Sequence, residues 1–333
     1  MIATRRSAFC LAAVCCCLLV ASLLAAAAVA APEYFSVSFV DRTHGWAAGI
    51  DDDYNSKVWR TVDGGATWVP VASQVAAGGG MGWVRFVSTT AGVWGYGSLA
   101  RTGDGGDTWA PAAAPGGTYN RAAFSDALNG WAVYSWGSSE SGGGIVHTSD
   151  GGAVWSVQLD RPGPDGSGGF SRVSAPTARR CYALKWGRSA GIYATSDAGA
   201  GWARRILPAF GKKYRYYRDL DFPGSRLGWA VGDAGRIVKT GDGGGHWVQQ
   251  TSGCSARLTA VDFVDGKLGY VVGQGGRALK TTDGGRHWKR LRTGTQKELQ
   301  AVCFVDRTHG WVAGRGGVLL ATADGGRTWS GQH

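Results

Sequence analysis

A cluster of basic and aromatic side chains in the second half of the chain is the strongest chemical signal in the sequence. Residues 212–218 read Lys-Lys-Tyr-Arg-Tyr-Tyr-Arg, and the fork of N–H donors on Arg suits planar carboxylates. Interleaved Tyr and Arg are also typical of interface centres. The predicted partner-binding residues are Arg188, Lys212, Lys213, Arg215, Arg218, Arg236, Arg257, Arg277 and Arg315. The alternative is a solvated basic surface without a defined ligand.

Charge is divided unevenly along the 333 residues. Residues 31–169 hold 7 Lys and Arg against 13 Asp and Glu, whereas residues 170–333 hold 26 against 11. Such an asymmetry predicts that one side of the molecule attracts an acidic partner. Nucleic acid is an acidic partner as well, but the export signal described below argues against it.

Carboxylates suited to hydrolysis are scarce. Residues 31–333 contain three Glu, namely Glu33, Glu140 and Glu298, and none has an obvious Tyr partner for a sialidase-type nucleophile. Asp219 and Asp221 lie on one expected inner strand, where alternation points both the same way. A glycosidase needs two carboxylates that flank its substrate. The sequence therefore predicts no catalytic residues, with a glycan-binding or glycoside-hydrolysing propeller as the alternative.

Metal and disulfide chemistry are equally poorly supported. Asp51, Asp53 and Asn55 resemble the start of a calcium loop, but the glycine and the distal Glu of such a loop are missing. Four of the seven Cys lie in the first 31 residues, and the other three show no metal-ligand spacing. These three are Cys181, Cys254 and Cys303. We expect no metal and no cofactor.

The first 31 residues have the composition of a targeting segment. Arg5 and Arg6 precede an uncharged stretch, residues 8–29, and Ala28-Val29-Ala30 offers a small-residue cleavage site. This pattern predicts a signal peptide, and its length also allows an uncleaved membrane anchor. Either way we expect an exported protein in a periplasm, a thylakoid lumen or at the cell surface.

One pattern recurs seven times and indicates the architecture. It reads Thr-x-Asp-Gly-Gly-x-Thr-Trp in its full form, as in residues 61–68, and we call it the Asp-box. Its aspartates are Asp63, Asp104, Asp150, Asp197, Asp242, Asp283 and Asp324. Their spacing of 41–47 residues is the length of a four-stranded propeller blade. A second repeat, Phe-Val-Asp-Arg-Thr-His-Gly-Trp, occurs at residues 39–46 and 304–311.

The sequence therefore predicts an all-β fold: a single seven-bladed β-propeller of four-stranded antiparallel blades with Asp-box hairpins over residues 32–333. The expected blades cover approximately residues 34–75, 76–116, 117–162, 163–210, 211–253, 254–295 and 296–333. In the sixth blade the expected strands are 258–264, 269–273, 277–281 and 287–291, and turn residues separate them.

Each Asp-box residue type has a structural explanation. The Asp carboxylate can accept N–H bonds from its own turn, the glycines supply positive φ, and the Trp returns into the sheet. His246 and His287 replace the Thr of their boxes, so we expect them to be structural too. The fourth box has Ala198 in place of a turn Gly and Gly201 in place of the Thr, which predicts the least regular blade.

These units, together with the repeated Gly-Trp-x-Val/Ala-Gly segments, resemble the BNR/Asp-box repeats of the photosystem II stability/assembly factor family. Sialidases, xyloglucanases and sortilin-type receptors also carry Asp-boxes. The resemblance implies a seven-bladed, exported, non-enzymatic scaffold, peripheral to a membrane where it helps a membrane complex to assemble. It implies a protein partner with an acidic or carboxylate-bearing segment, held on an arginine-rich face.

Because the four strands of each blade are antiparallel and consecutive, each class of loop emerges on one of two faces of the propeller. Turns between strands two and three, and the links between blades, emerge on one face, while the Asp-boxes and the turns between strands one and two occupy the other. The predicted partner-binding residues fall on the first face, over blades four to seven. Asp51, Asp52 and Asp53 fall on the same face in blade one, so we expect that face to be electrically polarised.

Overall fold

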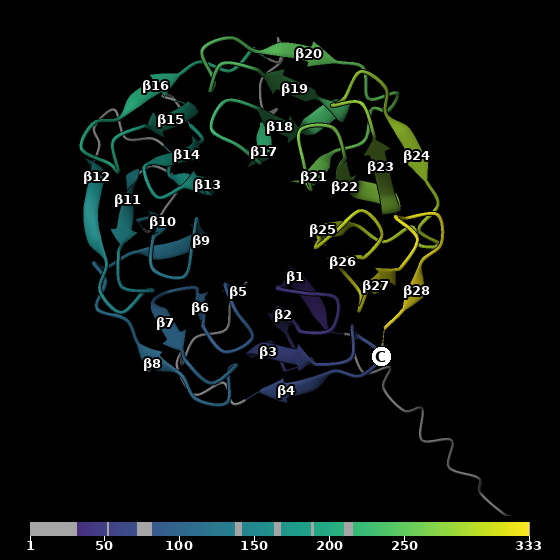
Figure 1. Cartoon of the computed structure of the whole chain (residues 1–333), viewed down its shortest axis with the longest axis horizontal. Helices are drawn as coiled ribbons and strands as arrows, with labels where there is room; N and C mark the ends of the chain where they lie inside the picture. Colours follow the sequence, from purple (N-terminus) through teal and green to yellow (C-terminus); the bar gives the residue numbers. More distant parts are fainter. Residues whose placement is uncertain are drawn as a thin grey trace, which may run out of the picture. The chain divides into compact units, whose positions relative to one another are not determined.

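The computed structural model describes residues 32–51, 53–71, 82–136, 142–162, 168–187, 190–209 and 216–332, all within the unit Ala31–His333. These residues form seven four-stranded antiparallel sheets, each made of four consecutive strands. The sheets stand radially around a central opening (Figure 1). The predicted seven-bladed all-β propeller is confirmed. The described residues contain no helix long and apolar enough to cross a bilayer.

Each blade follows the same order from the innermost strand to the outermost. The first four blades are β1 (Glu33–Phe39), β2 (Gly45–Ile50), β3 (Ser56–Thr61) and β4 (Val69–Val71); β5 (Trp83–Phe86), β6 (Gly92–Gly95), β7 (Leu99–Thr102) and β8 (Ala110–Pro111); β9 (Thr118–Phe124), β10 (Gly130–Ser135), β11 (Gly142–Thr148) and β12 (Ser156–Pro162); and β13 (Phe170–Thr177), β14 (Arg180–Lys185), β15 (Gly191–Thr195) and β16 (Ala203–Arg205).

The remaining three blades include two short 3-10 turns. They are β17 (Tyr217–Asp221), β18 (Gly228–Gly232), η1 (Asp233–Gly235), β19 (Ile237–Thr240) and β20 (Val248–Gln250); β21 (Leu258–Phe263), β22 (Gly269–Gly273), η2 (Gln274–Gly276), β23 (Arg277–Thr281) and β24 (Lys289–Leu291); and β25 (Leu299–Phe304), β26 (Gly310–Gly314), β27 (Leu319–Thr322) and β28 (Ser330–Gly331). In the sixth blade, β22 and β23 have the predicted bounds, and β24 starts two residues later because the Asp-box hairpin extends further.

Neighbouring blades are joined by stacked aromatic rings. Trp46, in the second strand of blade one, stacks on Phe86 of the next blade's first strand, with ring centroids 3.5 Å apart. Four other joints repeat this stack with centroids 3.5–3.6 Å apart: Tyr182–Phe222, Trp229–Phe263, Tyr270–Phe304 and Trp311–Phe39. Gly228 covers the other side of the Phe222 ring, and a Cβ there would overlap that ring. The Gly-Trp repeat therefore encodes a flat slot for the Phe.

The Asp-box closes its own hairpin through side-chain oxygens. In blade one, Thr61 Oγ1 donates to Asp63 Oδ1 at 2.7 Å, and the N–H of Thr67 donates to the same oxygen at 3.0 Å. Thr67 Oγ1 donates to Asp63 Oδ2 at 2.6 Å. These bonds hold the pKa of Asp63 well below its usual range. Across the described chain, each of the seven aspartates serves its own turn.

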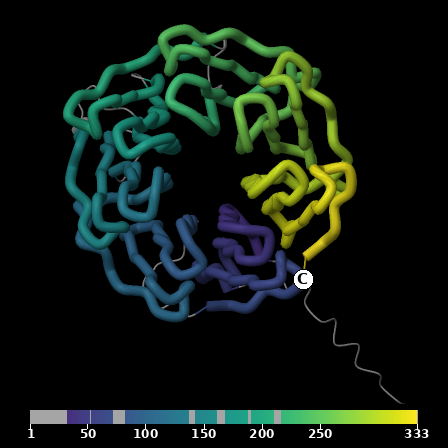
Figure 2. The backbone as a smooth tube through the Cα atoms, viewed as in Figure 1, coloured from purple at the N-terminus to yellow at the C-terminus, as the bar shows by residue number. Residues whose placement is uncertain are grey.

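The ring closes between blades seven and one without any exchange of strands. Blade seven consists of β25 to β28 only, and β1 packs against β25 and β26. Trp311 stacks on Phe39 and donates its indole N–H to the carbonyl oxygen of Gly64 at 2.8 Å. Figure 2 shows the last blade beside the first. Side-chain packing therefore makes this seam in the same way as the joint between Trp46 and Gly105.

The fourth Asp-box keeps its turn at the expense of backbone strain. The N–H groups of Gly199 and Gly201 still bond to Thr195 and Asp197. Ala198, however, sits at φ 62°, where the other six boxes have Gly. The first strand of this blade also pairs with two register shifts. The irregularity predicted for this blade is seen as these local features, and its four strands remain.

We predict that Ala198→Gly stabilises the protein by roughly 0.5–1 kcal/mol, because it removes an unfavourable left-handed Ala at a partly offsetting entropic cost. Urea unfolding checks this. Ala153→Gly is the matched control, since Ala153 lies in the third box without positive φ, and it should be neutral or destabilising. Equal effects of the two substitutions would contradict the strain.

We also predict that Trp311→Ala destabilises the protein by about 3–5 kcal/mol, the usual cost of removing a buried Trp. Trp229→Ala, at an internal joint, should cost a similar amount because both rings are buried and stacked. Thermal and urea unfolding of both variants test the seam. A much smaller cost for Trp311→Ala would show that the ring is not closed by this stack.

Candidate functional site

The hydrogen bonds of the loops define two faces. Asp-box hairpins bond to the turns between strands one and two, for example through Gly64 N–H and Thr43 O at 2.9 Å. Turns between strands two and three bond to the links between blades, as in Asp233 N–H to Tyr216 O at 3.0 Å. We call these the Asp-box face and the link face. The described partner-binding candidates project from the link-face elements.

Three of those candidates form a chain of alternating charges across blades five to seven. Arg218 binds both oxygens of Asp233 at 2.9 Å. Arg257 lies between Asp233 and Glu298, 3.5 Å from each. Arg315 contacts Glu298 at 3.2 Å and reaches Glu33 of blade one at 3.9 Å. We call this series the charge ladder.

The charge ladder shows that several predicted partner-binding arginines are paired with carboxylates. Burial raises the pKa of Asp233, but hydrogen bonds from Arg218 and the Tyr216 N–H outweigh it and leave that pKa below its usual value. Glu298 lies in the link and Glu33 at the start of β1, and no pattern in the sequence pairs either of them with Arg. Each guanidinium is therefore fixed in direction by a carboxylate while its outer edge stays partly exposed.

The other predicted residues differ in what surrounds them. Arg236 donates to Gln249 at 2.8 Å, and Arg277 is half-buried in blade six. Arg188, Lys212, Lys213 and Arg215 lie outside the described residues, so their predicted role stays a prediction. Arg292 and Lys297 are exposed in the link before β25, and no described carboxylate pairs with either. Over blades five to seven the described link face thus carries more cations than carboxylates.

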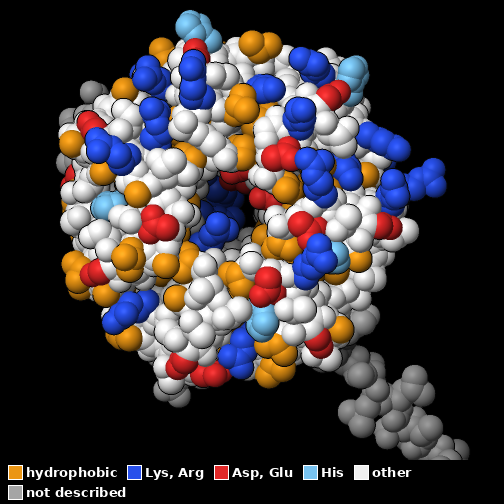
Figure 3. Space-filling view, viewed as in Figure 1, with side chains coloured by type: hydrophobic (Ala, Val, Ile, Leu, Met, Phe, Trp, Pro, Cys, Tyr) orange, Lys and Arg blue, Asp and Glu red, His pale blue; other side chains and the backbone are white. Residues whose placement is uncertain are grey.

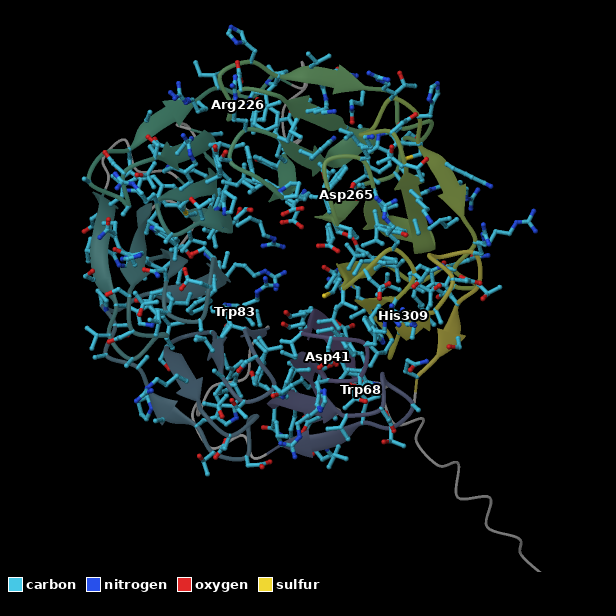
Figure 4. The ribbon with its side chains drawn as sticks, in the orientation of Figure 1. Asp41, Trp68, Trp83, Arg226, Asp265 and His309 are labelled. Atoms are coloured by element: carbon cyan, nitrogen blue, oxygen red, sulfur yellow. The ribbon has the colours of Figure 1, made fainter. Side chains whose placement is uncertain are left out.

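An aromatic pocket opens beside the central channel and is lined largely by link-side residues. Its walls include Trp83, Tyr96, Tyr119 and Trp186, with Arg121 and Arg172 among its polar groups, and its volume is ≈ 320 Å³. A neighbouring pocket is lined by Tyr216, Tyr217 and Arg218 as well as Trp186 and Arg172. The charge ladder therefore adjoins concave surface with aromatic walls. Figure 4 shows the labelled Trp83 near the central opening and Trp68 farther out.

The central channel holds Asp219 and Asp221, which the sequence placed on an inner strand, and also Asp262, Arg85 and Arg121, which sequence reasoning missed. Asp219 and Asp221 point into it from β17, on one wall as predicted, and Asp262 joins them from β21. Arg85 and Arg121 enter from β5 and β9. Figure 3 shows basic side chains on one side of the opening and acidic ones on the other. A signal was available in the sequence: a charged residue on an inner strand shortly before the repeat Phe, such as Arg121 before Phe124.

The channel carboxylates also link the blades. Asp219, Asp221 and Asp262 accept the N–H groups of Val261, Phe263 and Phe304 at 2.7–3.0 Å. Burial raises the pKa of all three. The pKa of Asp221 rises to about 8, because the charge of Asp262 adds to burial, and that of Asp262 rises to about 6. For Asp219 the positive charges of Arg172 and Arg121 oppose the effect.

Histidines on the Asp-box face do not form a catalytic relay. In both copies of the second repeat, the Thr hydroxyl and the Asp carboxylate approach the same ring nitrogen, Nδ1. A nucleophile and an orienting acid need opposite ring nitrogens. Figure 4 shows Asp41 and His309 in these turns. Within the described part of the chain, the rings of His246 and His287 likewise hydrogen-bond only to their own box Asp, at 2.6 and 2.7 Å.

Comparison with known proteins bears on this architecture. Residues 213–297 and 287–333 match the model of the family described as photosynthesis system II assembly factor YCF48. A solved structure of YCF48 bound to D1 peptide superposes with a TM-score of 0.69 and 18% identity, covering 89% of this chain and 94% of that one. YCF48 from Cyanidioschyzon merolae gives 0.66 and 19%, covering 88% and 95%.

In its last three blades the chain is similar to the photosystem II assembly factor family. The resemblance expected from its repeats is thereby confirmed, and the match to the family model lies in the last three blades, which carry the charge ladder. At these identities, the solved structures establish the fold alone. No curated protein is similar enough in sequence to match the chain.

Propellers of another class share the fold as well. The GH74 xyloglucanase from Xanthomonas campestris superposes with a TM-score of 0.68 at 14% identity, over 91% of this chain and 55% of the enzyme. This chain thus spans about half the length of that enzyme. The likeness shows a common blade architecture and carries no activity with it.

We predict that stability falls as pH rises through the range of the channel pair. A carboxyl whose folded pKa exceeds its unfolded value contributes stability that is full below the unfolded pKa and is lost as pH rises through the folded one. For Asp221 and Asp262 those folded values are about 8 and about 6. The free energy of unfolding should therefore drop by roughly 1–3 kcal/mol between about pH 5 and about pH 9.

The matched variant is the double substitution Asp221→Asn and Asp262→Asn, since each amide oxygen can still accept the N–H of the next blade. Urea unfolding at several pH values should then give a flatter profile than wild type. An unchanged profile in the double variant would contradict the assignment of this loss to the channel pair.

Proposed function

We propose that the protein is an exported, non-enzymatic scaffold that docks an acidic or carboxylate-bearing protein segment on its link face. The observation that carries the proposal is the excess of cations there. Over blades five to seven, seven Lys and Arg side chains share that face with Asp233, Glu298 and, from blade one, Glu33. The seven are Arg218, Arg236, Arg257, Arg277, Arg292, Lys297 and Arg315.

The ladder supports docking because it pre-orients its guanidinium groups. A side chain already fixed by a carboxylate loses less conformational entropy when a ligand adds to its outer edge. Arg218 also lies over the ring of Tyr216, 5.6 Å from its centroid. Guanidinium groups beside a pocket lined by aromatic side chains suit a peptide that carries both acidic and apolar side chains. A peptide-bound YCF48 structure among the similar folds is consistent with this class of ligand.

The resemblance to the family suggests a setting for this docking. We propose that the segment belongs to a membrane complex under assembly and that the scaffold is peripheral to that membrane. Electrostatic attraction would then speed the encounter and weaken with salt.

A fluorescent peptide rich in Glu and Tyr tests the proposal. The triple substitution of Arg257, Arg277 and Arg315 to Ser should weaken its binding roughly tenfold or more, because each exposed charge contributes up to about 1 kcal/mol and Glu298 would be left uncompensated. Fluorescence anisotropy at low and high salt measures the effect.

The matched control changes the same charge on the opposite face, at Arg42, Arg307 and Arg327. Arg42 and Arg307 are paired there with Asp306 and Asp265 at 2.7 Å, so both triple variants leave carboxylates unpaired. The control should bind the peptide like wild type. An equal loss of peptide binding in both triple variants would show that binding depends on net charge and not on the link face.

A glycan-active propeller is the second candidate, favoured by the aromatic pocket and by the xyloglucanase fold. The channel carboxylates oppose hydrolysis, since Asp219 and Asp221 share one strand and each gives an oxygen to a backbone N–H. Trp83 is 3% exposed and leaves little ring face for a sugar. Release of reducing sugar from xyloglucan by the purified protein would replace the docking proposal with this one.

A further inference from the structure

The channel wall is built in two layers of inner-strand residues. One layer contains the residue that precedes the repeat Phe on each strand, and the other contains the residue two positions earlier. The first layer includes Ser38, Arg85, Asp221, Asp262 and Cys303. The second, nearer the link face, includes Ser36, Arg121 and Asp219, with Arg172 at the matching place on β13.

Two arginines in these layers form no ion pair with a carboxylate among the described residues. Arg172 lies 3.4 Å from Asp219, so those two charges offset each other. Arg121 donates to the Ser36 hydroxyl at 2.9 Å and forms no ion pair among the described residues. Arg85 is exposed to the channel, and no hydrogen bond or ion pair joins its side chain to the described chain. Arg121 is partly buried, and a buried cation without a counter-charge is costly.

The facing carboxyls do not supply that counter-charge in full. Asp221 and Asp262 are each fixed by a backbone N–H, and neither forms an ion pair with Arg85 or Arg121 in the described chain. Burial raises both pKa values, and the charge of Asp262 adds to this effect at Asp221, so the pair holds a proton above the usual pH range of Asp. The pKa of Arg121 is lowered to about 10 by burial and by Arg172, which still leaves it charged.

Other groups around the pair leave this balance unchanged near neutral pH. Burial raises the pKa of the Cys303 thiol to about 12, so β25 contributes a neutral group. Burial also raises the pKa of Tyr270, behind Asp262, which keeps it neutral. β1 contributes only the hydroxyls of Ser36 and Ser38. Arg85 and Arg121 are therefore the channel arginines that form no ion pair with a carboxylate of the described chain.

We propose that the central channel binds a small carboxylate anion, held between the guanidinium groups of Arg85 and Arg121. The free volume of ≈ 250 Å³ admits such an anion together with several waters. The planar carboxylate matches the donor forks of the two arginines, and the protonated member of the Asp pair can donate a further hydrogen bond. Arg121 also lines the aromatic pocket on the link side, but the proposal does not depend on peptide docking.

The site should be linked to pH through Asp221 and Asp262. Raising the pH removes the shared proton and places a second negative charge beside the bound anion, so binding weakens. We expect acetate affinity to fall roughly tenfold between about pH 6 and about pH 9. By reciprocity, acetate should raise the apparent pKa of the pair.

Isothermal titration of the full chain with acetate, in a buffer without other carboxylates, tests the proposal. One acetate per chain is expected at about pH 6. Arg85→Gln and Arg121→Gln should each weaken it roughly tenfold or more. Arg85→Gln breaks no described bond, so it guards against loss through misfolding. The Asn substitutions at 221 and 262 should remove the pH dependence while binding persists.

Arg101→Gln, an exposed arginine on β7, is the control and should bind acetate like wild type. Absence of saturable acetate binding to wild type at about pH 6, up to about 100 mM, would overturn the proposal. Full binding by Arg85→Gln and Arg121→Gln would overturn it as well. Because acetate does not report on the peptide, failure here leaves docking on the link face to its own test.

Discussion

The architecture depends on one contact, the flat stack of an aromatic ring in one blade on the repeat Phe of the next. Trp46 on Phe86 and Trp311 on Phe39 are equivalent members of this set, and both indoles donate to the carbonyl of an Asp-box glycine in the next blade. The Asp-box therefore has two structural roles: it closes its own hairpin, and it presents a carbonyl to its neighbour. Five joints share this stack, and the seam between blades seven and one is among them, so the ring closes there without a shared strand.

That constraint determines on which face each loop emerges, but the residue types within the loops can vary. Links and turns between strands two and three emerge together, so Arg218, Arg257 and Arg315 of three blades meet Asp233 and Glu298 in one series. The residues of the inner strands are constrained as well, because alternate side chains either pack against the next blade or face the channel. Asp221 meets both demands at once through Phe263 N–H, which explains how a charge is tolerated so near the axis.

Much of the fold was legible in the sequence because its signal is repeated seven times. The Asp-boxes, their spacing and the Gly-Trp segments were sufficient for the blade number, the strand order and even the bounds of β22 and β23. The site was less legible, because its contacts join blades. Nothing in the chain order pairs Arg257 with Glu298, or brings Arg85 of blade two before Asp262 of blade six. Those relations come from the radius of the ring, which a local pattern does not encode.

The seam between the first and last blades tests the central stack most directly, since no strand is exchanged across it in the described structure. Hydrogen exchange of the indole N–H groups, followed by NMR, compares Trp311 at the seam with Trp46 at an internal joint. The account predicts similar strong protection for both, because both donate at 2.8 Å to an Asp-box carbonyl. Rapid exchange at Trp311 beside slow exchange at Trp46 would show an open ring and contradict it.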